Sequence, residues 1–66
     1  MKLRVIHTTD GKYRGAVFVV EDASIGEINR VSARDFTPDT VDVDPEEMTV
    51  TARSSHYTII AKIVEV

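Results

Sequence analysis

Basic and aromatic side chains gather in residues 1–20, and they are the first group in this chain that could do chemistry. Four basic residues and one acidic residue give this segment a net charge of +3, against −6 for residues 21–66. Because basic groups bind phosphates and aromatic rings stack on bases, the segment is a candidate nucleic-acid site. Basic side chains at a strand edge also block edge-to-edge aggregation, a role that needs no ligand. The residues of the candidate nucleic-acid site are Lys2, Arg4, Lys12, Tyr13 and Arg14.

A run of acidic residues at positions 39–47 is the second group. Within it, Asp42-x-Asp44-x-Glu46 imitates the first half of a calcium-binding loop, where alternate carboxylates converge on one hard cation. The glycine that permits the sharp turn of such a loop and the later bidentate glutamate are both missing. The pattern therefore favours a solvated loop, and we predict no metal site and no cofactor.

Ser54, Ser55 and His56 are the third group, with the residue types of a nucleophile and its base. Adjacent residues in a tight turn rarely reach the aligned geometry of catalysis, which normally comes from distant segments with a third group orienting the histidine. A chain of 66 residues also has little room for a ligand pocket of several hundred cubic ångströms. We therefore predict that the protein is not an enzyme.

Residues 48–66 must position the serine pair, because apolar and polar residues alternate before it and again after it. This pattern is typical of two antiparallel strands joined by a tight turn. With Ser54 and Ser55 as the loop residues, Val50 lies opposite Ile59. One face of the predicted hairpin is then apolar and belongs to a core. Its members are Met48, Val50, Ala52, Tyr57, Ile59, Ala61 and Ile63.

Asp10-Gly11 lies between two apolar alternations and predicts a second hairpin, because both central residues of a type I′ turn need positive φ. With these two residues as the loop, Leu3 lies opposite Phe18. Gly15, in the second strand, can mark a bulge. That strand is apolar on both sides, as is found inside a closed barrel or under a subunit interface.

The middle of the chain predicts shorter elements. Ser24-Ile25-Gly26-Glu27 has the spacing of a capping box, and β-branched residues follow it at three-residue intervals, which predicts a short helix near residues 24–31. Because Gly26 and the β-branched residues disfavour a helix, a bent strand over residues 27–36 is the alternative. Residues 40–43 predict a short strand, and Asp44 followed by proline predicts a single helical turn.

Two hairpins with four to five short strands and one short helical turn predict a mainly β fold, in a single domain of residues 1–66. The favoured architecture is a small antiparallel barrel, SH3-like or OB-like. The alternative is an α+β arrangement with the element order ββαββ.

The last strand carries the candidate protein-interaction residues. Ile60, Val64 and Val66 point away from the predicted core face and leave this strand apolar on both sides. We interpret it as an exposed edge that pairs with a second copy, with the N-terminal strand of the same barrel or with another protein. The leading prediction is a non-enzymatic protein-interaction module, an accessory or regulatory subunit that self-associates as a homo-oligomer or docks on a larger protein. The alternative is a nucleic-acid-binding domain that uses the basic N-terminal hairpin.

Size and composition set the remaining expectations. No segment approaches the roughly 18 consecutive apolar residues of a membrane helix, and residues 1–11 lack a signal-peptide cleavage site. We therefore expect a cytoplasmic protein without a membrane partner. The absence of cysteine excludes disulfides and thiolate metal sites. A domain this small without such supports is marginal as a monomer, which is a further reason to expect a homo-oligomer.

Overall fold

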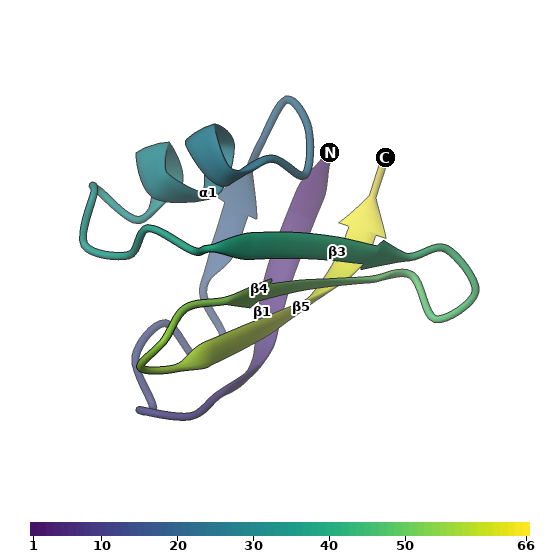
Figure 1. Ribbon diagram of the computed structural model, residues 1–66. Coiled ribbons are helices and arrows are strands. Elements are labelled where there is room, and N and C mark those ends of the chain that lie inside the picture. The colour runs from purple at the N-terminus through teal and green to yellow at the C-terminus, as the bar shows by residue number, and fades with distance from the viewer.

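The computed structural model describes all 66 residues, with one antiparallel sheet and one short helix (Figure 1). The elements in chain order are β1 (Lys2–Thr8), β2 (Val17–Val19), α1 (Ile25–Val31), β3 (Thr40–Asp44), β4 (Thr49–Arg53) and β5 (Thr58–Glu65). The five strands follow the order β2-β1-β5-β4-β3. The prediction of a mainly β fold is confirmed, and the ββαββ alternative lacks one strand. Because β2 and β3 each pair on one side only, the sheet is open and a barrel is not confirmed.

The last strand, β5, lies in the middle of the sheet. It pairs antiparallel with β1 on one side and with β4 on the other. Of the three pairing partners predicted for this strand, the structure shows the N-terminal strand of the same chain, so β5 is a central strand and not an exposed edge. At eight residues β5 is the longest strand, and two neighbours satisfy its backbone groups on both sides.

The β4–β5 hairpin keeps the predicted faces along its strands but has a longer loop than predicted, and Met48, predicted for the core face, is instead exposed in the turn before β4. Val50 lies opposite Ala61, and Ala52 lies opposite Ile59, so the register differs by two residues from the predicted one. A shift of two leaves every side chain on the same face. The loop is longer because the Ser54 hydroxyl accepts hydrogen bonds from the backbone N–H groups of His56 and Tyr57 at 3.2 Å.

The β1–β2 hairpin shows the predicted pairing of Leu3 with Phe18 but not the predicted two-residue turn. Residues 9–16 form a wide loop, because the Asp10 carboxylate accepts hydrogen bonds from the Thr8 hydroxyl and the Lys12 N–H. The predicted bulge at Gly15 is confirmed: the N–H of Gly15 donates to the Val5 carbonyl at 2.9 Å, although Val5 already faces Ala16.

The predicted helix is confirmed as α1, and the bent-strand alternative is excluded. Ser24 is its N-cap and accepts a hydrogen bond from the Glu27 N–H at 3.2 Å, as the capping motif predicted. The predicted strand over residues 40–43 is confirmed as part of β3. The predicted helical turn after Asp44 is instead the turn between β3 and β4, in which the Asp44 carboxylate accepts from the N–H groups of Glu46 and Glu47.

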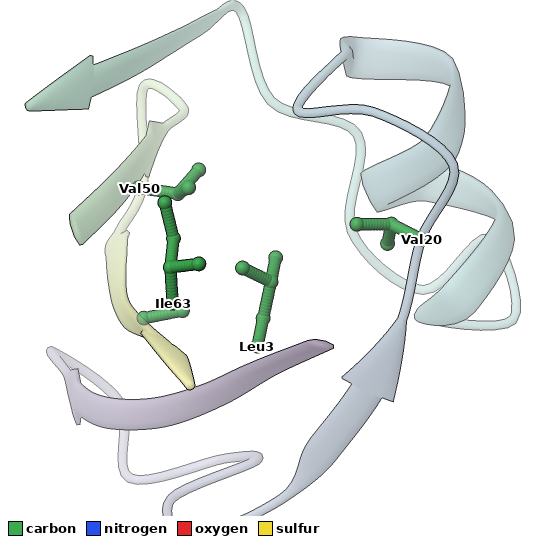
Figure 2. Packing of buried hydrophobic residues seen from close by; sticks show 5 residues of the cluster. Leu3, Val20, Val50 and Ile63 are labelled. Atoms are coloured by element: carbon green, nitrogen blue, oxygen red, sulfur yellow. The ribbon is translucent and has the colours of Figure 1, made fainter. Parts of the chain in front are cut away.

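The core lies between α1 and one face of the sheet, which we call the inner face. Leu3, Val50 and Ile63 point from three strands into this space, and Val20 meets them from the segment after β2 (Figure 2). A second cluster, around Phe36, extends the core toward the loop of the β4–β5 hairpin. The opposite face of the sheet, which we call the outer face, is not covered by α1.

Candidate functional site

The outer face carries half of the large apolar side chains that the protein exposes. Four of the eight such residues lie there, including Val19, which is 64% exposed, and Ile6, which is 51% exposed. A fifth apolar residue on this face, Ile60, is half-buried on the central strand. We call this set the apolar face; it comprises Ile6, Val17, Val19, Ile60 and Val64.

Strand geometry explains why these side chains share one face. Phe18 lies opposite the buried Leu3 and points inward, so its neighbours Val17 and Val19 point outward. On β1 a bulge between Val5 and His7 adds one residue opposite β5, and both Ile6 and His7 are exposed. The bulge thus places an apolar side chain beside the β5 residues of the same face.

Two cations lie in the middle of the apolar face. Arg4 on β1 is directly opposite Lys62 on β5 and directly opposite Val17 on β2. Like charges in directly opposed positions are unfavourable unless something neutralises them. The Lys62 ammonium donates to the backbone carbonyl of Glu47, whereas Arg4 takes part in no ion pair. The centre of the face is therefore positive, with apolar side chains on β2, β1 and β5 around it and Thr49 opposite Lys62 on β4.

The structure places Ile60 and Val64, two of the three predicted interaction residues, on this face but not at an edge. Val64 is 41% exposed and Ile60 is half-buried, and both lie on the outer face of the central strand. Val66 follows the end of β5 and is 89% exposed. A partner would therefore meet these side chains from the face of the sheet, because the backbone of β5 is already paired.

The residues of the candidate nucleic-acid site are not brought together. Lys2 pairs with Glu65 at 3.5 Å on the strands, while Lys12 pairs with Asp35 at 2.7 Å in the β1–β2 loop. The Tyr13 ring makes a T-shaped contact with Phe18, with 5.8 Å between ring centroids, and its hydroxyl bonds Asp35, so this ring is held in the β1–β2 loop. The two predicted basic residues without an ion pair are Arg4 and Arg14.

Asp35 is a residue that sequence analysis missed, and it holds the β1–β2 loop in place. Its carboxylate accepts hydrogen bonds from the Lys12 ammonium at 2.7 Å and the Tyr13 hydroxyl at 2.9 Å. These bonds hold the pKa of Asp35 below its ordinary value and raise the pKa of Lys12. The pKa of the Tyr13 hydroxyl is raised by burial and by its bond to Asp35. The only sign of this contact in the sequence is the opposite charge of Lys12 and Asp35, and no local pattern connects two residues 23 positions apart.

The acidic and serine-histidine groups have structural roles. Asp44 caps the β3–β4 turn, and Asp42 lies 3.9 Å from the Arg53 guanidinium on exposed strand positions. No group of three or more metal-ligating side chains is found in the structure. The Ser54 hydroxyl bonds the backbone of its own loop, including the Tyr57 carbonyl, at 3.2 Å. The Ser54 side chain therefore shapes the loop that precedes β5.

One cavity lies between the inner face and α1. Its volume is about 30 Å³, and eleven of its twelve lining residues are hydrophobic. Ser32 is the exception; its hydroxyl lies within hydrogen-bond distance of the carbonyls of Asn29 and Phe36, donates to one of them at a time, and accepts from the Phe36 N–H. Every buried side-chain nitrogen and oxygen has a hydrogen-bond partner. The cavity is a loosely filled part of the core and offers no free polar group to a ligand.

Comparison of the chain with protein-family models, with curated proteins and with solved structures finds no match. None of the helices has the length and apolar character needed to cross a membrane. The apolar face of the sheet, with its two cations, is thus the feature on which a functional proposal can be based.

Proposed function

We propose that the protein is a non-enzymatic interaction module, an accessory or regulatory subunit that docks on a larger protein through the apolar face. The observation that carries the proposal is the exposure of apolar side chains on three adjacent strands, β2, β1 and β5. Val19, Ile6 and Val17 are 64%, 51% and 48% exposed on two of these strands. Exposed apolar side chains grouped on one surface mark interaction sites more often than singly scattered ones do.

The apolar face is continuous across the three strands. Val17 adjoins Arg4 on β1, Arg4 adjoins Lys62 on β5, and Ile60 and Val64 flank Lys62 along its strand. Because α1 covers only the inner face, a partner is needed to remove these side chains from water. A central strand also resists distortion better than a loop, which suits a rigid docking surface.

The charges in the face define the chemistry of the partner. Arg4 and Lys62 repel each other in the free protein, so a partner gains by placing a carboxylate between them. The apolar side chains around them favour a partner surface with aliphatic or aromatic residues around that carboxylate. We therefore propose an acidic site with an apolar rim on the partner protein.

The test is affinity capture from a lysate of the source cell, treated with nuclease, with the wild-type protein and a face variant as baits. Ile60→Lys/Val64→Lys places two charges on the face without touching the core. We expect a protein that is retained by the wild type to be lost with this variant.

Met48→Lys is the matched control, because Met48 is also an exposed apolar residue, at 38%, but lies in the β3–β4 turn. It should retain the captured protein. Circular dichroism spectra of the three baits establish that each is folded. Equal capture by the face variant and the wild type would refute docking through the apolar face.

Nucleic-acid binding is the second candidate, and the observation that favours it is the opposition of Arg4 to Lys62 with Arg14 also unpaired. Polyanions neutralise such cations, and their affinity falls steeply with salt. Fluorescence anisotropy with a labelled oligonucleotide tests it. Arg4→Glu/Arg14→Glu should abolish binding that the wild type shows at low salt, and binding that survives this variant would exclude the site.

A further inference from the structure

The open edge of β2 exposes a defined set of backbone groups. Val5 N–H donates to the Ala16 carbonyl and Val20 N–H donates to the Met1 carbonyl, both at 2.9 Å. The even-numbered residues between 16 and 20 therefore point their backbone N–H and C=O groups toward β1. In an antiparallel pair the residues between them point their backbone groups away. The N–H and C=O of Val17 and the N–H of Val19 therefore face solvent. The Val19 carbonyl already accepts a hydrogen bond from the Arg30 guanidinium at 3.2 Å.

The open edge of β3 exposes a matching set. The pattern starts on β4. Ile63 N–H donates to the Met48 carbonyl and Ser54 N–H donates to the Tyr57 carbonyl, so the even-numbered residues of the β4 segment point their backbone N–H and C=O groups toward β5. The odd-numbered residues of β4 then bond the even-numbered residues of β3, with which they are in register. On β3, the backbone groups of Val41 and Val43 are left to face the open side.

We propose that β3 of a second copy adds in parallel to β2, with Val17 opposite Asp42 and Val19 opposite Asp44 of that copy. In a parallel pair, a residue donates to the carbonyl before the residue opposite it and accepts from the N–H after it. Val17 N–H then donates to the Val41 carbonyl, and Val17 C=O accepts from the Val43 N–H. Val19 N–H donates to the Val43 carbonyl, so each open group of β2 finds a partner.

The two edges also match where the pairing ends. The next bond of this register would run from the N–H of residue 45 to the Val19 carbonyl. Residue 45 is proline and has no N–H, and the Val19 carbonyl is already satisfied by Arg30. The Val19 carbonyl therefore does not need the N–H that Pro45 lacks, and the pairing leaves no backbone group unpaired at this end.

Charge selects this pairing over its alternatives. Parallel addition in this register keeps both outer faces on the same side, so Asp42 and Asp44 of the second copy lie next to Val17 and Val19. Arg4 and Lys2, one strand further in, lie opposite those two valines and are within reach of the carboxylates. Pairing of two β2 edges would bring the cations of both copies together, and pairing of two β3 edges would do the same for the carboxylates.

The contact joins different surfaces of the two copies, so every copy keeps one open β2 edge and one open β3 edge for the next. Such heterologous contacts form open chains unless they happen to close into a ring. The inference goes beyond the proposed function, because it concerns the edges of the sheet and makes no use of Ile60 or Val64.

Two proline variants test the register. Val17→Pro removes a donor from the open side of β2, and Val43→Pro does the same on β3; neither N–H serves the internal ladders. Isotope-labelled Val43→Pro, which keeps its β2 edge, is titrated with unlabelled Val17→Pro, which keeps its β3 edge, and followed by amide NMR. We expect the largest shifts at the Val17 and Val19 amides, and a one-to-one complex that grows no further.

Titration of the labelled protein with unlabelled Val43→Pro is the control, since this titrant offers no β3 edge. It should shift neither valine amide. Shifts with unlabelled Val43→Pro that exceed those with Val17→Pro would show pairing between β2 edges, and equal shifts with both titrants would show contact that depends on neither edge. Either result would overturn the proposal, as would the absence of shifts with either titrant at millimolar concentration. The amide spectrum of each variant alone shows whether it is folded.

Where a proline variant does not fold, Val17→Lys and Asp42→Lys replace the pair, because each puts a repelling cation at one edge. The Ile60→Lys/Val64→Lys variant separates this inference from docking through the apolar face. It should assemble like the wild type while losing the captured partner. If affinity capture depends on the apolar face but the Val17 and Val19 amides do not shift in the titration, the edge pairing is overturned and docking through the apolar face is not.

Discussion

The two open edges of the sheet, β2 and β3, are built in opposite ways. β2 has three residues, carries the exposed valines Val17 and Val19, and has no charged side chain of its own. β3 has five residues and carries Asp42 and Asp44 on its outer face. The β2 edge is short and apolar, and the β3 edge is longer and acidic.

The difference shows two ways of keeping a sheet edge from uncontrolled pairing. Charged side chains along β3 repel another edge of the same kind. On β2 the protection is the short length of the strand and the Arg30 guanidinium, which Glu27 holds against the Val19 carbonyl. An edge protected by its short length and one side chain remains open to pairing, and the acidic β3 edge of a second copy is the partner that we propose for it.

The largest expected effect is on stability, because the residue next to β2 is buried in the core whereas the residue compared with it on β3 is half-exposed. Val20→Ala, directly after β2, removes two methyl groups from a side chain that is 2% exposed and should cost about 2 kcal/mol. Val43→Ala on β3 changes a side chain that is 47% exposed and should cost less than about 0.5 kcal/mol. Urea denaturation of both variants measures the difference, and similar midpoints would contradict unequal anchoring.

A smaller effect should come from the loop that leads into β2. Tyr13→Phe keeps the ring against Phe18 but removes the hydroxyl that bonds Asp35 at 2.9 Å and the Ser32 carbonyl at 3.3 Å. The loss should be about 1 kcal/mol, the usual net contribution of a hydrogen bond. Thermal or urea unfolding checks it. Stability equal to that of the wild type would show that the loop does not help to hold β2.

Acid should weaken the pairing of Glu27 with Arg30, the residue that protects the β2 edge. Hydrogen bonds from Arg30 and from the Glu21 N–H lower the pKa of Glu27 to about 2. Because this pKa is depressed, the ionised carboxylate stabilises the fold above the ordinary value of 4.5, and this stabilisation is lost as the pH falls toward 2. Urea midpoints of the wild type should therefore fall more steeply over this range than those of Glu27→Gln. Parallel pH dependences would contradict the role of Glu27.

The smallest effect should come from the one ion pair on β3. Asp42 and Arg53 lie 3.9 Å apart and are 70% and 60% exposed, so Asp42→Ala should change the stability of the monomer by less than about 0.5 kcal/mol. Urea denaturation in dilute solution measures it. A loss above about 1 kcal/mol would mean that Asp42 stabilises the monomer. A variant of Asp42 could then not distinguish a loss of edge pairing from a loss of folding.

Local patterns predicted much of the fold because they act over a few residues. Ser24 capped the predicted helix, and alternation identified the buried face of β4 and β5 even though the loop between them was misplaced. The two predicted tight turns failed because hydrogen bonds of the Asp10 and Ser54 side chains widen the loops, and residues far along the chain hold the widened loops in place. Asp35 holds Lys12 and Tyr13 in the first loop, and the Phe36 ring stacks on Tyr57 beside the second, with 4.7 Å between centroids.

The candidate surface was predicted only in part, for the same reason. Alternation showed that Val17, Val19, Ile60 and Val64 point away from the core. That these residues share one face on adjacent strands depends on the pairing of β1 with β5, which joins residues far apart in the chain. No short pattern encodes that pairing, so β5 was wrongly predicted to be an edge and Arg4 could not be placed opposite Lys62.

The central position of β5 has a consequence for the order in which this protein folds. β1 is made first, but its long neighbour is made last, since Lys2 pairs with Glu65. During synthesis β1 can form only its short hairpin with β2, which is too small to be stable alone. The sheet therefore forms only after residue 65 has left the ribosome. Closing so long a stretch of chain makes folding slow for a domain of this size, because β1 cannot pair with β5 until both ends of the chain meet.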